Sequence, residues 1–259
     1  MQKKIILITG ANSGLGKTLA KELSKDFVVY AGARNPGEVE EGRNIKSIKL
    51  DITSEKDCKD AMEKVVENEE RIDVLINNAG YALVGPTTDF KTEEFLKILD
   101  TNIVGAFRLI KYAVPYMKKQ KGGRIINITS LNGIISLPNF GLYSSSKHGL
   151  HALGIALHYE LQKYGIWVTN LAPGAIASEG KTTKSLPHKP AREKFRILSL
   201  LMPMLTRRDV AEKVRELIDS SHPPAQVIMG ADARIVTFLK KILPSCLWDK
   251  LLFYIWSKK

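Results

Sequence analysis

The chain has little cysteine, no long apolar run and no dense block of basic residues. Only Cys58 and Cys246 occur among its 259 residues, without a neighbouring thiol and without Cys/His spacing suited to zinc. We therefore expect both to be reduced, small apolar residues, in keeping with a reducing, cytoplasmic location. No apolar run reaches the roughly 18 residues that a membrane-spanning helix needs, so no spanning helix is expected.

The formal net charge of +12 is compatible with a nucleic acid, an anionic lipid or an anionic cofactor as partner. The lysines are scattered along helical stretches and no nucleic-acid motif occurs, which favours a solvated basic surface and no nucleic-acid partner. His148, His151 and His158 lie close in sequence, but no two of them are four residues apart, the spacing typical of a helical zinc site. We therefore expect surface or packed histidines and no metal.

Apolar segments rich in Ile, Val and Leu alternate with longer amphipathic segments over most of the chain. Continuously apolar strands between helices predict a parallel sheet, buried on both faces and covered by helices on both sides. We therefore predict a single α/β domain of the doubly wound, Rossmann type over residues 1–232, followed by a C-terminal amphipathic helical extension over 233–259. The predicted strands are 5–9, 27–31, 45–50, 74–76, 124–128, 166–171 and 226–229, and the predicted helices are 14–24, 54–69, 92–119, 143–163 and 206–220.

A glycine-rich turn follows the first predicted strand and precedes an amphipathic helix, which is the order that a dinucleotide pyrophosphate requires. Gly10 permits a tight turn, Gly14 lets the backbone approach phosphates, and Gly16 lets the helix pack close to the sheet. The spacing differs from the general Gly-x-Gly-x-x-Gly fingerprint, and a turn that merely reverses the chain is the alternative. The predicted cofactor-binding residues of this turn are Gly10, Asn12, Ser13, Gly14, Leu15 and Gly16.

Arg34 follows the second predicted strand, at a position where a protein that prefers NAD usually carries an acidic residue. A guanidinium can neutralise the 2′-phosphate of NADP(H). We therefore predict NADP(H) as the cofactor, with an exposed loop cation as the alternative interpretation of Arg34.

Three further motifs follow in order: Asn77-Asn78-Ala79-Gly80, Ser130, and Tyr143 with Lys147 four residues later. Together with the glycine-rich turn and Asn102, they resemble the short-chain dehydrogenase/reductase family over about residues 3 to 230, in particular its NADP(H)-dependent, hydroxysteroid and retinol dehydrogenase-like members. Taken singly, each residue has an ordinary structural interpretation, as a helix-starting aromatic, a solvated lysine, a cap or a polar helix residue. The complete set favours the family.

The spacing of Tyr143 and Lys147 places both side chains on one face of a helix, about one turn apart. A free tyrosine titrates near pH ~10, and a neighbouring ammonium favours its phenolate. At an effective dielectric of ~20, a unit charge ~4 Å away contributes roughly 4 kcal/mol, or about three pKa units. We therefore expect Lys147 to lower the pKa of Tyr143 toward neutrality.

The resemblance implies a role for each catalytic residue. Tyr143 would exchange a proton with the substrate oxygen, Ser130 would hydrogen-bond that oxygen, and Lys147 would also bind the nicotinamide ribose. Tyr143 and Lys147 are both predicted to bind the cofactor as well. Asn102, within a predicted helix, would hold a water that links Lys147 to solvent.

The resemblance also implies further cofactor contacts. Asp51 and Ile52 would meet the adenine, and Asn77, Ala79 and Gly80 would lie along the riboses. The nicotinamide would meet Pro173, Gly174, Ile176 and Ser178, where Ser178 stands in place of the more common threonine.

Two segments bear on the substrate. Residues 179–205 include the apolar run 198–202 and, by resemblance, form a lid over a hydrophobic alcohol or ketone, or else a surface helix packed on the domain. In the extension, Ile235, Phe238, Leu239 and Ile242 form one apolar helical stripe opposite Lys240 and Lys241, Pro244 breaks the pattern, and Ser245 can cap a second helix. This extension can cover the substrate pocket, contact a partner subunit or lie on a membrane.

The sequence therefore predicts an NADP(H)-dependent oxidoreductase that acts on a hydrophobic carbonyl or alcohol, with steroid-like, retinoid-like and lipid-like substrates grouped together. One alternative is a 3-oxoacyl-thioester reductase, and another, from a different class, is a non-catalytic protein that senses NADPH. The resemblance further implies a homodimer or homotetramer formed through the helices that include Asn102 and Tyr143.

Overall fold

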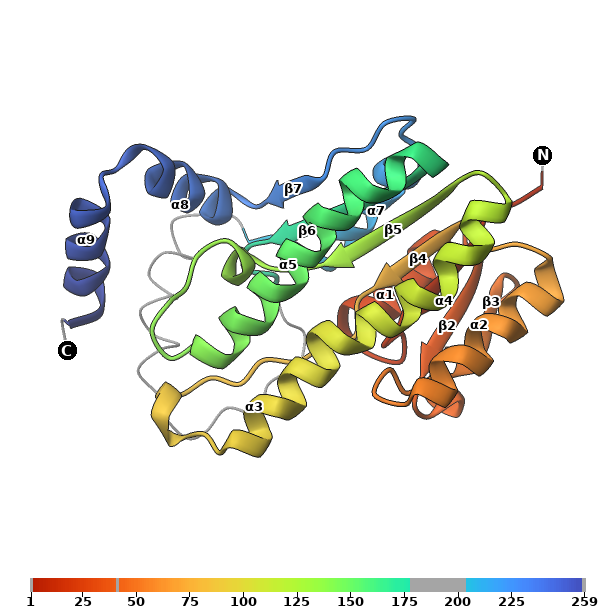
Figure 1. The fold of residues 1–259 in the computed structure, drawn as a ribbon, viewed down its shortest axis with the longest axis horizontal. Helices are drawn as coiled ribbons and strands as arrows, with labels where there is room; N and C mark the ends of the chain where they lie inside the picture. The colour runs from red at the N-terminus through yellow and green to blue at the C-terminus, as the bar shows by residue number, and fades with distance from the viewer. Residues whose placement is uncertain (1, 41, 178–203, 258–259) are drawn as a thin grey trace.

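A computed structural model describes residues 2–40, 42–177 and 204–257. Seven parallel strands form one sheet in the order β3-β2-β1-β4-β5-β6-β7, which confirms the predicted doubly wound α/β fold (Figure 1). The strand order reverses between β1 and β4, and ligands of such sheets bind outside the carboxyl ends of the strands near this point. The strands are β1 (Ile5–Thr9), β2 (Val28–Ala33), β3 (Ile45–Lys49), β4 (Val74–Asn77), β5 (Gly123–Ile128), β6 (Ile166–Pro173) and β7 (Gln226–Met229).

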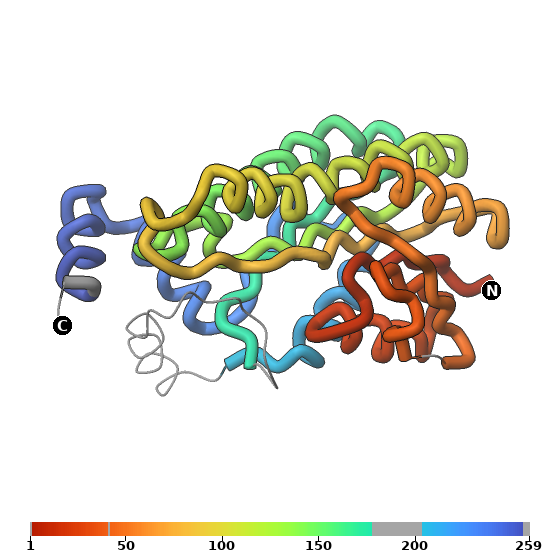
Figure 2. Tube along the Cα trace, turned by 90° about the horizontal axis from the view of Figure 1, so that it is seen from below, coloured from red at the N-terminus to blue at the C-terminus, as the bar shows by residue number. Residues whose placement is uncertain are grey.

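Successive side chains of a strand point to opposite faces of the sheet, and in these strands both sets are apolar. Helices therefore cover both faces. Ile6 and Ile8 pack with α1 (Gly14–Leu23) and α7 (Arg207–Asp219). Ile5 and Leu7, the residues that alternate with them, pack with α2 (Glu55–Glu69), α4 (Gly105–Lys119) and the carboxyl end of α5 (Gly141–Leu161). Figure 2 shows these two helical layers on opposite sides of the sheet.

The prediction that every strand is buried on both faces is wrong for β3. Lys46, Ser47 and Lys49 are exposed there, because β3 is the edge strand of the sheet. The second strand is also shifted, to Val28–Ala33 in place of 27–31. The strand β2 therefore includes Ala33, and Arg34 is the first residue after its carboxyl end.

The single helix predicted over 92–119 is wrong in its middle. The chain forms α3 (Thr92–Leu99), then a π-helical turn over Asp100–Val104, then α4. In this turn the Gly105 N–H bonds to the carbonyl of Asp100, five residues back. The extra residue turns Asn102 into the interior, where its side chain is almost fully buried.

The predicted extension over 233–259 corresponds to two helices, α8 (Ala231–Ile242), which begins two residues before the predicted boundary, and α9 (Ser245–Ser257), with Pro244 between them as predicted. Figures 1 and 2 show α9 at the end of the molecule farthest from the N-terminus. Phe238 is 61% exposed and Phe253 is 75% exposed, so a large part of the apolar surface of the extension faces outward. Within the described ranges, no helix has the length and apolar character needed to cross a membrane.

Candidate active site

The glycine-rich turn is tied to the end of β4 by a side chain that the sequence analysis did not single out. The hydroxyl of Thr9 accepts hydrogen bonds from the main-chain N–H groups of Asn78 and Ala79, at 3.0 and 2.8 Å. The Asn78 amide donates in return to the Thr9 carbonyl at 2.9 Å. These bonds join the turn after β1 to the Asn-Asn-Ala-Gly segment after β4, on both sides of the point where the strand order reverses.

The turn leaves room for a phosphate group. Gly10 and Gly14 have φ angles of +64° and +54°, which favour glycine. A Cβ atom on Gly16 would lie 2.5 Å from the Asn78 amide nitrogen, whereas one on Gly14 would meet nothing within 4 Å. The backbone at Gly14 therefore borders open space at the start of α1, where first-turn N–H groups suit a pyrophosphate.

The remaining predicted residues of the turn flank it on two sides. Ser13 is the N-cap of α1 and makes no side-chain capping bond in the described part of the chain, while Leu15 packs against the core. The Asn12 amide donates to the carboxylate of Glu38 at 2.7 Å. Asn12 is thereby linked to the segment that follows β2.

Arg34 is exposed just after β2, and its charge acts on the carboxylates of Glu38 and Asp51. Hydrogen bonds from Asn35 and Asn12, with a smaller contribution from the charge of Arg34, lower the pKa of Glu38. Burial raises the pKa of Asp51, but hydrogen bonds from Thr53 and the charge of Arg34 outweigh it and lower the pKa overall. Arg34 thus lies near Glu38, which the Asn12 hydrogen bond ties to the glycine-rich turn.

Ser130, Tyr143 and Lys147 come together where β5 ends. Ser130 follows β5, and its hydroxyl accepts a hydrogen bond from the Asn132 N–H at 3.1 Å. Tyr143 lies in the first turn of α5, and the Lys147 ammonium is 5.9 Å from the centre of its ring. That ammonium is buried and donates to the Ile128 carbonyl at 2.8 Å.

The electrostatics of this cluster differ from the sequence-based expectation. Burial raises the pKa of the Tyr143 phenol, while a hydrogen bond with Ser130 lowers it by a smaller amount. Burial lowers the pKa of Lys147 to about 8. The expected large depression of the Tyr143 pKa by Lys147 is therefore absent, because both groups are desolvated and Lys147 bonds to the Ile128 carbonyl. The phenol is held protonated at neutral pH.

Asn102 and Gly80 complete one side of the cluster. The Asn102 amide nitrogen donates to the Tyr81 carbonyl and to the Ser146 hydroxyl, both at 2.9 Å, and its oxygen accepts from the Tyr81 N–H. A Cβ atom on Gly80 would lie 2.9 Å from this oxygen and 3.6 Å from the Lys147 nitrogen. The absence of a side chain at Gly80 therefore lets Asn102 and Lys147 approach the same point.

Asn77 lies deeper than the other residues of its segment. It is buried within the sheet, and its amide nitrogen donates to Asn127 on the neighbouring strand at 2.9 Å. Asn127 donates in turn to Asn170, which donates to the His151 carbonyl of α5 at 2.7 Å. This ladder of three asparagines links the sheet to the helix that carries Tyr143 and Lys147, and sequence patterns gave no sign of it.

The predicted nicotinamide turn follows β6. Pro173 ends that strand, the Gly174 N–H donates to the Met229 carbonyl at 2.9 Å, and Ile176 forms a parallel bridge with Leu205. Ser178 lies outside the described residues, as do residues 179–203 of the lid segment predicted over 179–205.

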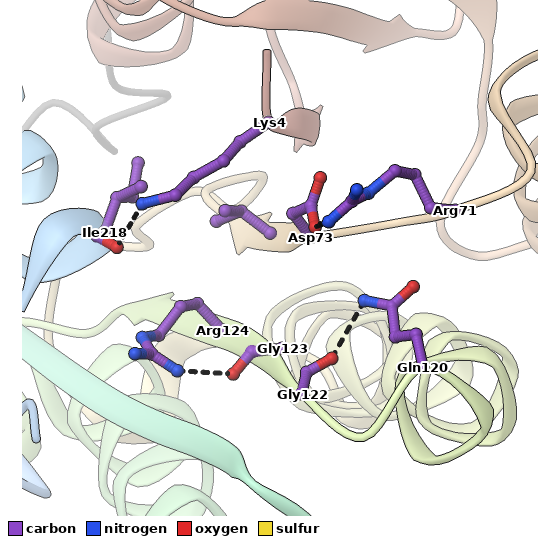
Figure 3. A pocket seen from close by; sticks show the side chains of 9 residues that line it. Lys4, Arg71, Asp73, Gln120, Gly122, Gly123, Arg124 and Ile218 are labelled. Carbon is purple, nitrogen blue, oxygen red and sulfur yellow. Dashed lines mark hydrogen bonds and ion pairs between the residues drawn. The ribbon is translucent and has the colours of Figure 1, made fainter. Parts of the chain in front are cut away.

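A hollow lies at the amino ends of β1, β4 and β5, at the opposite end of these strands from Ser130 (Figure 3). Its cations already have partners: Lys4 bonds to the Ile218 carbonyl at 3.0 Å, Arg71 pairs with Asp73, and Arg124 bonds to main-chain carbonyls. The cluster of Ser130, Tyr143 and Lys147 at the carboxyl edge is the candidate active site.

Comparison with known proteins agrees with this geometry. The family model described as short chain dehydrogenase matches residues 4–189. A 3-ketodihydrosphingosine reductase from Bacteroides thetaiotaomicron is 38% identical over 179 residues, which are 67% of this chain and 64%, slightly under two thirds, of that protein. A 3-oxoacyl-[acyl-carrier-protein] reductase from Thermotoga maritima is 33% identical over 257 residues, which are 91% of this chain and 99% of that protein.

A solved structure, ElxO with NADP bound, matches with a TM-score of 0.76 and 31% identity, covering 88% of this chain and 96% of that one. The chain belongs to the short-chain dehydrogenase family of oxidoreductases.

Proposed function

We propose that this chain is an NADP(H)-dependent oxidoreductase that reduces the carbonyl group of a hydrophobic substrate. The observation that carries the proposal is the meeting of Ser130, Tyr143 and Lys147 at the carboxyl edge of the sheet, next to an open glycine-rich turn. The bound nicotinamide would supply the hydride. The chain's own residues would position the carbonyl and deliver the proton.

The protonation state of Tyr143 favours reduction. Because burial raises its pKa, the phenol carries its proton at neutral pH and can donate it to the substrate oxygen as that oxygen gains negative charge. Ser130, which hydrogen-bonds Tyr143, would donate to the same oxygen. Lys147, with a pKa of about 8, can return a proton to the tyrosinate after the reaction.

The cofactor part of the proposal assigns the pyrophosphate to residues 10–16, the adenine to Asp51 and Ile52, and the 2′-phosphate to Arg34. The open space before Gly14, the exposure of Arg34 and the NADP in ElxO support it. Arg34→Ala should weaken NADPH binding by at least tenfold and leave NADH binding within about twofold, since one charge-assisted contact is worth roughly 1.5–3 kcal/mol. Equal weakening of both cofactors would contradict the role of Arg34.

The substrate part of the proposal is a ketone on a lipid-like chain. Two relatives are named as reductases, one of 3-ketodihydrosphingosine and one of a 3-oxoacyl-[acyl-carrier-protein], and the extension exposes Phe238 and Phe253. A specific alternative is a 3-oxoacyl-thioester reductase. The Thermotoga relative, which matches 91% of this chain, supports this alternative, and the net charge of +12 would suit an acidic carrier protein.

One assay separates these possibilities. NADPH oxidation is followed with a long-chain 3-keto lipid, a 3-oxoacyl thioester and short water-soluble aldehydes as substrates. The lipid ketone should give the highest kcat/KM, and a higher value for the thioester would select the alternative. Tight NADPH binding without turnover of any substrate would favour a cofactor-sensing protein.

The proposal includes peripheral membrane contact through the extension. Lys240, Lys241 and Lys250 are exposed on the same two helices as Phe238 and Phe253, and helices that expose both lysines and aromatic residues suit an anionic lipid surface. The full chain should float with vesicles that contain phosphatidylserine, and a Phe238→Ser/Phe253→Ser variant should not. Flotation of both proteins alike would contradict this contact.

We further propose a homodimer formed through α4 and α5. Phe107 on α4 is 46% exposed and Tyr159 on α5 is 69% exposed, and such apolar surface is typical of subunit interfaces. Phe107→Glu should convert a dimer into a monomer in sedimentation velocity, and an unchanged sedimentation coefficient would exclude this face.

A further inference from the structure

The first turn of α8 lies directly against the predicted nicotinamide turn. β7 ends at Met229, Gly230 follows with a φ of +95°, and Asp232 is the acidic residue in the first turn of α8. The Asp232 carboxylate accepts a hydrogen bond from the main-chain N–H of Ala175 at 2.8 Å. The helix α8 thus begins with a direct contact to the segment after β6.

The fit around this carboxylate is tight. A Cβ atom on Gly174 would lie 2.5 Å from the carboxyl carbon of Asp232 and closer still to both of its oxygens. A Cβ atom on Gly230 would also lie 2.5 Å from one of these oxygens. The carboxylate therefore fills space that only the two glycines leave free, which restricts the positions that residues 174 and 175 can take.

The same helix packs on the segment after Ser130. Ala233 is fully buried in a cluster with Leu131 and Ile135. The Lys240 ammonium donates to the Ile134 carbonyl at 2.7 Å. The helix α8 thus contacts both segments that border the catalytic cluster, the turn after β6 and the residues that follow Ser130.

We propose that Asp232 is a positioning residue, which holds Gly174 and Ala175 in the arrangement that receives the nicotinamide. This inference rests on the proposed function, because the cofactor contact of the turn is itself part of that function. It makes α8 an integral part of the active site, whatever the outer surface of the extension contacts. The acceptor oxygen toward Ala175 is the essential feature.

The test compares Asp232→Ala, Asp232→Asn and Asp249→Asn in the full chain. NADPH dissociation constants come from fluorescence titration, and KM for NADPH and kcat from steady-state kinetics. Asp249 is a matched control, since it lies on α9, is exposed and carries the same charge. Asp232→Ala should weaken NADPH binding about tenfold or more. Asp232→Asn should keep the NADPH dissociation constant within about threefold of the wild type, because its amide oxygen can still accept the bond. Asp249→Asn should match the wild type. Wild-type affinity in Asp232→Ala, or an Asp232→Asn as weak as Asp232→Ala, would overturn the proposal.

A double-mutant cycle adds a readout that a merely structural role would not give. Gly174→Ala places a methyl group against the carboxylate, so it should weaken NADPH binding strongly in the wild type and clearly less in Asp232→Ala. An equal effect in both backgrounds would overturn the proposal. If Asp232→Ala does not fold, Asp232→Ser replaces it in the cycle with the same expected and contradicting outcomes.

Different results would contradict the proposed reaction and the role of Asp232. Wild-type protein that binds NADPH but reduces no carbonyl would contradict the proposed reaction and leave the role of Asp232 in cofactor binding intact. Wild-type protein that reduces carbonyls, with Asp232→Ala equal to it, would contradict only the role of Asp232.

Discussion

Lys147 gives a prediction whose size follows directly from the structure. Its ammonium is buried with the Ile128 carbonyl as hydrogen-bond acceptor, and the pKa is lowered from 10.5 to about 8. Below pH 8 both the folded and the unfolded chain carry the proton, and the folded chain bears the full cost of the buried charge. As pH rises from about 8 to 10.5, the folded chain loses the proton while the unfolded chain keeps it, so the cost falls and stability rises.

The shift corresponds to about 3 kcal/mol at pH 7, of which about 2 kcal/mol should disappear by pH 9.5. The measurement is the free energy of unfolding in urea, without cofactor, at pH 7, 8, 9 and 9.5 for the wild type and Lys147→Met. Tyr143 stays protonated over this range because burial raises its pKa. The wild type should gain about 2 kcal/mol relative to the variant across the series. Lys163→Met, which removes an exposed lysine just beyond the same helix, is the control and should show no such trend. A constant difference between wild type and Lys147→Met would refute the buried-charge argument.

Three further changes test the framework around the site. Thr9→Val leaves the N–H groups of Asn78 and Ala79 without their acceptor and should lower the free energy of unfolding in urea by about 2 kcal/mol, whereas Thr9→Ser should not. Equal stability of Thr9→Val and the wild type would argue against a stabilising role of these two hydrogen bonds. Gly16→Ala drives a methyl group toward the Asn78 amide and should weaken NADPH binding at least tenfold in fluorescence titration. Wild-type NADPH affinity in this variant would contradict the role of the turn. Asn170→Ala removes two bonds of the asparagine ladder and should lower the melting temperature and kcat together, so a change in the melting temperature alone would separate the ladder from catalysis.

The sheet was predictable because its information is local and repeated. Largely apolar strands, such as β1 with four consecutive apolar residues before Thr9, alternate with amphipathic helices, and this pattern admits few arrangements. The glycine-rich turn and the spacing of Tyr143 and Lys147 are equally local signals. They sufficed to predict the fold and to select candidate residues that the structure brings together.

Other features depend on contacts between distant residues, which periodicity does not record. The π-helical turn at Asn102 is compensated by hydrogen bonds to Tyr81 and Ser146, and the hydrophobic pattern of 92–119 continues through it unchanged. The exposure of β3 follows from its place at the sheet edge. The raised pKa of Tyr143 follows from burial that helical spacing alone does not reveal.

The C-terminal extension also combines features that the local sequence predicts with a contact that it does not. Its apolar stripe and Pro244 predicted two helices, and both are present. The carboxylate of Asp232 against Gly174 joins residues 58 positions apart in the sequence, and only the folded chain brings them into contact. The extension therefore has an inner part fixed to the active site and an outer part with exposed aromatic residues.

The most direct test of the central claim compares the wild type with Tyr143→Phe in NADPH oxidation over the carbonyl panel and in NADPH binding. The phenylalanine keeps the ring and removes only the proton donor. We predict that kcat falls by about 100-fold or more, while the NADPH dissociation constant changes by less than about twofold. Equal turnover by the two proteins would contradict the assignment of Tyr143 as the proton donor.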